Sequence, residues 1–81
     1  MSSREEVKNR LQRVFREVFG DESLVLRDDM TAADVPDWDS LNHINLVVGA
    51  ERSFKVTLTT KEVTALRNVG QFIDLLLSKL P

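Results

Sequence analysis

The residue types that could perform catalysis are concentrated in one short stretch, at Asp39, Ser40 and His43. An acid, a serine and a histidine raise the possibility of a hydrolase with a serine nucleophile. The spacing argues against it, because Ser40 and His43 lie three residues apart on different arcs of one predicted helix, and Asp39 serves better as a helix cap. A small helical protein also has little volume for a water-poor cleft with an oxyanion hole. We therefore predict that the chain is not an enzyme.

The run Asp37-Trp38-Asp39-Ser40-Leu41 instead predicts a serine displayed at the start of a helix. Asp39 is a good N-cap, so a helix is expected from about Ser40 to Phe54, with the serine exposed at its first position. Trp38 precedes the cap and is expected to pack on the first turn as a hydrophobic staple. No neighbouring base is placed to activate Ser40. We expect its hydroxyl to be the substrate of another enzyme.

His43 is the single histidine of the chain, and it falls on an arc that we expect to face the core. A lone histidine on such an arc is usually a structural residue with one hydrogen-bonded nitrogen. The chain contains no cysteine, and no further ligands stand at metal-binding spacing. We predict no metal site.

Capping residues and apolar periodicity predict four helices in one domain spanning residues 1–81. The capping box at Ser3 and Glu6 opens a helix over about 4–19, with Gly20 in position to end it. A second capping box at Thr59 and Glu62 opens a short helix to about residue 66, and Asn68 caps the last helix. The expected fold class is therefore all-α: a small four-helix bundle with a short third helix and a long loop, over about 20–39, between helices one and two.

The predicted helix over 40–54 has two apolar arcs. The flanking helices each have one stripe, so the core accepts one arc, and the arc that ends in Phe54 is expected inside. The other arc is then partly exposed beside Ser40, where it forms a docking surface. Alternatively, both arcs are buried, the second against Leu24, Leu26 and Met30 of the loop. The inner arc is His43, Leu46, Val47, Ala50 and Phe54, and the outer arc is Leu41, Ile44 and Val48.

Charge is distributed unevenly along the chain. The net charge is +2 over residues 1–19, −6 over residues 20–40 and +2 over residues 41–81. The negative potential therefore lies in the loop that leads to Ser40, and basic protein surfaces are the natural complement. No basic face accompanies a recognition element, so we expect no nucleic acid as a partner. No apolar run is long enough to span a bilayer, so we expect no membrane partner either. The charged residues Arg4, Glu5 and Glu6 do not fit a signal-peptide pattern, and the absence of cysteine suits a reducing compartment, so we expect a cytoplasmic protein. We also expect a monomer.

These features together resemble acyl carrier proteins, the free-standing carriers of fatty-acid and polyketide-type synthesis. The resemblance covers nearly the whole chain and rests on the helix-one pattern, the long loop, the short third helix and three motifs. The motifs are Asp39-Ser40-Leu41, Phe54-Lys55-Val56 and Asn68-Val69-Gly70. It implies that Ser40, with Asp39 as the neighbouring motif residue, accepts 4′-phosphopantetheine from coenzyme A through a Mg²⁺-dependent phosphopantetheinyl transferase.

The resemblance also assigns roles around that serine. The terminal thiol of the arm would carry an acyl group as a thioester and exchange it with acyl-loading and acyl-transfer enzymes. Leu41, Ile44 and Val48 would contact these partners. The side chains that would shelter a short acyl chain are Val47, Ala50, Val63 and Leu66.

The chain departs from the housekeeping carriers of fatty-acid synthesis in one respect. Their second helix is strongly acidic, whereas the polar positions here are Asn42, Asn45, Arg52 and Ser53, and Glu51 is the single acid. This departure favours a dedicated carrier in a specialised pathway. Two alternatives stay open: an aminoacyl or peptidyl carrier, and an unmodified helical interaction domain.

Overall fold

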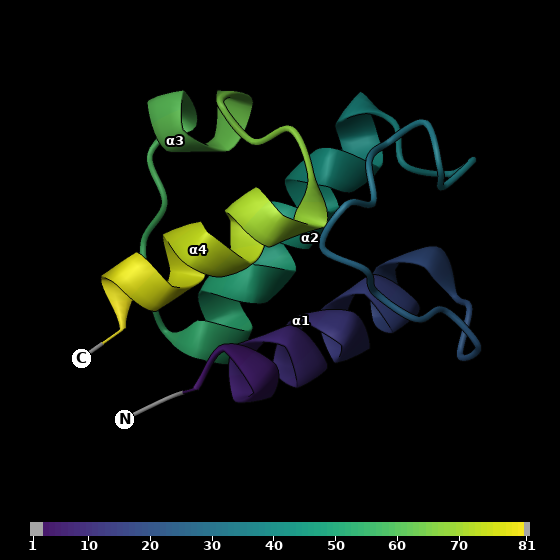
Figure 1. Cartoon of the computed structure of the whole chain (residues 1–81). Coiled ribbons are helices and arrows are strands. Elements are labelled where there is room, and N and C mark those ends of the chain that lie inside the picture. The colour runs from purple at the N-terminus through teal and green to yellow at the C-terminus, as the bar shows by residue number, and fades with distance from the viewer. Residues whose placement is uncertain (1–2, 81) are drawn as a thin grey trace.

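The computed structural model describes residues 3–80, and within that range it contains four helices and no strand (Figure 1). They are α1 (Arg4–Phe19), α2 (Ser40–Phe54), α3 (Thr60–Thr64) and α4 (Val69–Lys79). The predicted all-α class and the order of the elements are confirmed. The third helix ends at Thr64, two residues before the expected end, and the N–H of Leu66 bonds to Val63 O, three residues back, in a tighter turn.

Each helix begins at the cap that the sequence predicts. Ser3, Asp39, Thr59 and Asn68 all have extended backbones, and each side chain accepts a hydrogen bond from the N–H three residues later. Gly20 ends α1 in the left-handed conformation, with φ 64° and ψ 30°. These local contacts account for the helix boundaries before any tertiary packing is considered.

One hydrophobic core lies between α1, α2 and α4, with α1 packed against both of the other long helices (Figure 1). Each long helix contributes the stripe expected of it, although Val18, Phe19 and Leu80 at the stripe ends are half-buried. The buried helical residues are Val7, Leu11, Val14 and Phe15 of α1, Leu46, Val47, Ala50 and Phe54 of α2, and Val69, Phe72, Ile73 and Leu76 of α4.

The loop over residues 20–39 is held against this core. Leu26 and Met30 are buried and Leu24 is half-buried, so these three side chains anchor the loop on the core. Val35 is also buried, which the sequence had not indicated. The start of α4 secures the loop further, because the N–H of Val69 donates to Met30 O at 2.9 Å.

Gly70 allows the loop and α4 to approach closely. Its N–H donates to Asp28 O at 2.9 Å, and a Cβ at this position would stand 3.0 Å from the same oxygen. A side chain here would therefore press directly on the loop backbone.

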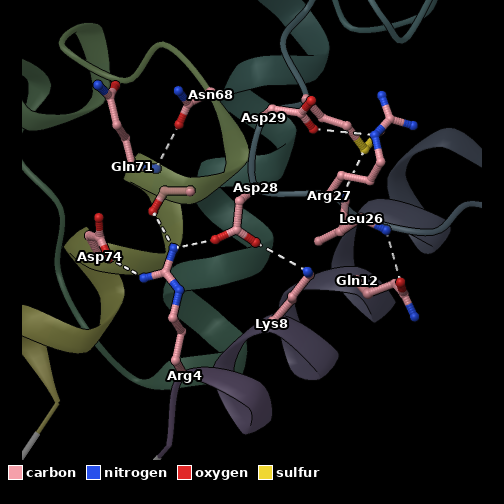
Figure 2. A network of polar contacts seen from close by, with 12 residues as sticks. Arg4, Lys8, Gln12, Leu26, Arg27, Asp28, Asp29, Asn68, Gln71 and Asp74 are labelled. Atoms are coloured by element: carbon pink, nitrogen blue, oxygen red, sulfur yellow. Dashed lines mark hydrogen bonds and ion pairs between the residues drawn. The ribbon is translucent and has the colours of Figure 1, made fainter.

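A network of charged side chains joins the same loop to α1 and α4 (Figure 2). Arg4 Nη2 lies 2.6 Å from Asp28 Oδ2, Lys8 Nζ lies 3.1 Å from Asp28 Oδ1, and Arg4 also contacts Asp74 of α4. The hydrogen bond from Arg4 and then that from Lys8 hold the pKa of Asp28 below its ordinary value. These ion pairs are half-exposed, so they orient the loop more than they stabilise the fold.

No helix within residues 3–80 is long and apolar enough to cross a membrane.

Candidate attachment site and adjoining groove

Ser40 stands exposed at the first position of α2, directly after its N-cap Asp39. Asp39 Oδ1 accepts the N–H of Asn42 at 2.8 Å, and Asn42 Nδ2 in turn donates to Asp37 O at 2.6 Å. The cap thus bonds to α2 and, through Asn42, to the end of the loop. The Ser40 hydroxyl is presented to solvent from a backbone that is fixed on both sides.

The start of α2 retains two backbone donors. Asp39 satisfies the N–H groups of Asn42 and His43, whereas those of Ser40 and Leu41 have no acceptor among residues 3–80. Unpaired N–H groups and the positive end of the helix dipole favour an anion at this place. A phosphodiester on Ser40 would therefore find a suitable electrostatic environment.

Trp38 holds the loop onto the first turn of α2. Its Nε1–H donates to His43 Nδ1 at 3.1 Å, and the two ring planes are inclined to each other by 22°. The indole also packs on Phe15 of α1, in a T-shaped arrangement with centroids 5.3 Å apart. The predicted packing of Trp38 on the first turn is confirmed, with His43 as its partner on that turn.

His43 is half-buried, and both of its ring nitrogens are occupied. Because Nδ1 accepts from Trp38, the proton lies on Nε2, which donates to Val63 O at 3.3 Å. The expectation of a core histidine with one hydrogen bond is therefore corrected: the side chain lies at the edge of the core, where it bridges α2 and α3. Within the described residues its two ring nitrogens bond to Trp38 and Val63, and no hydrogen bond joins it to Ser40.

An open groove with a volume of about 870 Å³ extends from Ser40 between α2 and the segment that contains α3. Three of the predicted acyl-site residues, Val47, Val63 and Leu66, line it. Ala50 does not line it, because its side chain is fully buried in the core beneath α2. The groove is mainly apolar, which is the surface that a hydrocarbon chain requires.

The outer arc of α2 is exposed, as the sequence predicts. Leu41 is 67% exposed, Ile44 58% and Val48 41%. The alternative of two buried arcs is contradicted, because the loop anchors pack into the main core and leave this arc uncovered. Ile44 and Val48 also form one wall of the groove, so the exposed arc and the groove are continuous.

Sequence reasoning missed other groove residues. Leu58 follows α2 and reaches the groove through the turn that precedes α3, and Arg67 lies at its margin beyond α3. Helical periodicity carries no signal for residues in these connecting segments. The caps Thr59 and Asn68 fix where α3 and α4 begin, but not that these segments approach α2.

Comparison with known proteins gives the family. No family model matches the chain. A curated acyl carrier protein of Acidothermus cellulolyticus is 33% identical over 72 residues, which cover 89% of this chain and 86% of the relative. The chain belongs to the acyl carrier protein family.

A solved structure agrees with this assignment. The solution structure of a holo acyl carrier protein from Geobacter metallireducens matches with a TM-score of 0.84 and 40% identity, over 90% of this chain and 84% of the other. As a member of the acyl carrier family, the chain is a carrier and not an enzyme. Its prosthetic group is 4′-phosphopantetheine, which would supply the thiol that this cysteine-free chain lacks.

Proposed function

We propose that Ser40 is the attachment point of 4′-phosphopantetheine. The observation that carries this proposal is the exposed Ser40 hydroxyl at the start of α2, beside two backbone N–H groups without acceptors. A separate phosphopantetheinyl transferase with Mg²⁺ would direct Ser40 Oγ onto the β-phosphorus of coenzyme A. The new Oγ–P bond forms as the bond to adenosine 3′,5′-bisphosphate breaks, and the hydroxyl proton leaves to a base of the transferase.

The carrier contributes position to this reaction. Asp39 holds the first turn of α2, and the dipole of that helix favours the phosphodiester product. Because His43 is committed to Trp38 and Val63, the base must come from the partner enzyme. This division of labour fits a protein whose serine is modified and does not react by itself.

We place the cargo in the groove between α2 and α3. The groove begins at Ser40, and its apolar lining includes Val47, Val63 and Leu66. A short acyl chain on a folded-back arm would lose contact with water there. The exposed arc of Leu41, Ile44 and Val48 would remain available to acyl-loading and acyl-transfer enzymes.

The surface of α2 favours a specialised pathway over bulk fatty-acid synthesis. Its single acid, Glu51, is half-buried and uses Oε2 to accept the N–H of Leu58 at 3.0 Å. The exposed polar positions Asn45 and Arg52 offer a basic partner no negative charge. Recognition through α2 would therefore depend on shape and apolar contact more than on charge. We expect the protein to act as a cytoplasmic monomer.

The modification is tested by incubating the protein with coenzyme A and a broad-specificity phosphopantetheinyl transferase, followed by intact mass spectrometry. We expect a gain of one phosphopantetheinyl group that is absent in Ser40→Ala and retained in the matched variant Ser53→Ala. No gain in the wild-type protein would support an unmodified helical interaction domain. A gain that persists in Ser40→Ala would assign the arm to another residue.

The class of cargo needs a second measurement. The modified protein is offered a panel of acyl-coenzyme A compounds and aminoacyl adenylates with their loading enzymes, and thioester formation is followed by mass. Preferential loading of acyl groups supports the acyl carrier. Loading of amino acids alone would favour an aminoacyl or peptidyl carrier.

A further inference from the structure

A second hollow lies between α1 and α2, away from Ser40, and three arginines surround it. Its volume is about 420 Å³, and Arg10 and Arg13 of α1 face Arg52 of α2 across it. It shares no lining residue with the groove at Ser40. Arg52 follows Ser40 by twelve positions on α2, which corresponds to roughly 18 Å along the axis.

The arginine charges are available to a partner. Within residues 3–80, Arg10, Arg13 and Arg52 form no ion pair, whereas Arg4 and Lys8 on the same α1 are both paired with acids. One acidic side chain, Glu17, borders the hollow. The local charge is therefore positive on a protein whose net charge is −2.

The guanidinium of Arg10 is held in place by contacts that leave some of its N–H donors free for a ligand. Its guanidinium lies over the Phe54 ring, with Cζ 4.2 Å from the centroid, and one Nη2–H is donated to Ser53 O. The remaining N–H groups of the fork are not used in these contacts. A pre-oriented guanidinium loses less entropy on binding a carboxylate than a mobile one does.

The close contact of α1 and α2 shapes the floor of the hollow. Gly49 lies where a Cβ would stand 2.7 Å from Val14 Cγ1, so the helices approach here more closely than a larger residue allows. The arginines from α1 and α2 thus line one depression at the place where the two helices meet.

We propose that this hollow, defined by Arg10, Arg13 and Arg52, is a second docking surface, which binds a carboxylate-rich surface of a partner protein. The mixed charge of the rim favours a protein, because Glu17 would repel a uniform polyanion but would pair with a basic residue among the carboxylates. A membrane is disfavoured, because the large exposed apolar side chains, Val25, Leu41, Ile44 and Val48, all lie elsewhere. Three cations are also few for a nucleic acid.

The location of the hollow has a functional consequence. A partner bound there would hold the carrier by α1 and the end of α2, and Ser40 with its groove would stay uncovered. The carrier could then remain bound to one acidic partner while the arm serves another enzyme. This inference does not depend on the identity of the modified serine.

The proposal is tested by titrating the ¹⁵N-labelled full chain with a glutamate-rich peptide that carries one central lysine, as a partner for Glu17, and following chemical shifts at low salt. We expect saturable shifts at Gly49, Ser53 and the arginine side chains, which weaken as salt increases. Arg13→Glu and Arg52→Glu should each weaken binding at least about fivefold. Lys61→Glu makes the same change in net charge on α3 and should weaken binding less than about twofold.

Three outcomes would overturn the proposal. Shifts confined to other parts of the chain would show that the hollow is not the site. Equal shifts with inorganic phosphate at matched charge would indicate a simple anion site, and binding to phosphatidylglycerol vesicles without binding to the peptide would indicate a membrane surface. Modification at Ser40 serves as the independent control, and we expect Arg52→Glu to accept phosphopantetheine at the wild-type rate. A slower reaction would make the hollow part of the transferase contact.

Discussion

The indole Nε1–H of Trp38 donates to Nδ1 of His43, and this 3.1 Å contact fastens the end of the acidic loop to the first turn of α2 beside Ser40. The same histidine continues to α3 through its 3.3 Å contact with Val63 O. One side chain therefore links the loop, α2 and α3, the three segments that border the attachment site. The placement of Ser40 relative to its groove depends on this connection.

Removal of the indole donor should loosen that connection. We expect Trp38→Phe to keep an aromatic ring near Phe15 but to lower the free energy of unfolding by about 0.5–1.5 kcal/mol through the lost hydrogen bond. Long-range ¹H–¹⁵N spectra should show one tautomer, with the proton on Nε2 of His43, in the wild-type protein and a mixture in the variant. An unchanged urea midpoint with a single tautomer would contradict this role.

Partner contact through the outer arc of α2 is tested at Ile44, which is 58% exposed. Ile44→Asp should slow phosphopantetheinylation by about tenfold if this side chain is a central contact of the transferase. Helix content by circular dichroism should stay unchanged. The neighbouring variant Asn45→Asp adds the same charge without removing apolar surface, and we expect it to react at a rate close to that of the wild-type protein. Equal rates for both variants would exclude Ile44 from the contact.

Burial of the inner arc is tested at Phe54, which is buried at the end of α2. Phe54→Ala should destabilise the protein by about 3–5 kcal/mol, because it leaves a cavity in the core and removes the ring beneath Arg10. Val48→Ala on the exposed arc of the same helix should change stability by less than about 0.5 kcal/mol. Chemical denaturation of both variants measures the difference, and a larger loss for Val48→Ala than for Phe54→Ala would assign the arcs in the opposite sense.

The contact of Gly49 with Val14 predicts a context-dependent effect. Alanine is the better helix former by about 1 kcal/mol, but its Cβ would overlap Val14 Cγ1 at 2.7 Å, and such overpacking costs about 1–3 kcal/mol. We therefore expect Gly49→Ala to be neutral or destabilising in the wild-type protein. The same substitution should be stabilising in a Val14→Ala background. A double-mutant cycle by urea unfolding measures the coupling, and additive effects would show that the helices separate freely.

The lowered pKa of Glu62 predicts that the stability of the fold depends on pH. The hydrogen bond from Lys79, and then that from the Thr59 backbone, lower the pKa of Glu62 from its ordinary value of 4.5 to about 2. A carboxylate with a lowered pKa stabilises the folded state fully above the unfolded pKa and loses this contribution as pH falls through the folded one. Glu62→Gln should therefore melt at a lower temperature than wild type above about pH 5, and the difference should shrink towards pH 2. A difference that stays constant over this interval would show that the charge of Glu62 is not involved.

Local features of the chain were sufficient to predict the helices and the serine. A cap such as Asp39 needs only the backbone N–H three residues later, and a stripe such as that of α4 follows from helical geometry alone. The position of Ser40 at the start of α2 follows from the same rules. The resemblance to the family agrees with this predicted position of Ser40, because the motif Asp39-Ser40-Leu41 lies at the predicted helix start.

The sequence favoured an exposed outer arc on α2 but left burial of both arcs open, and only the tertiary structure decided between them. The two arcs of α2 are similar in hydrophobicity, and packing of Leu26 and Met30 into the main core is what left Ile44 exposed. Ala50 is buried in the core and does not line the acyl groove, and three arginines line one hollow. Both facts depend on how helices distant in sequence pack together. Capping and periodicity act within a few residues, whereas burial and charge clustering depend on neighbours that the chain supplies from far away.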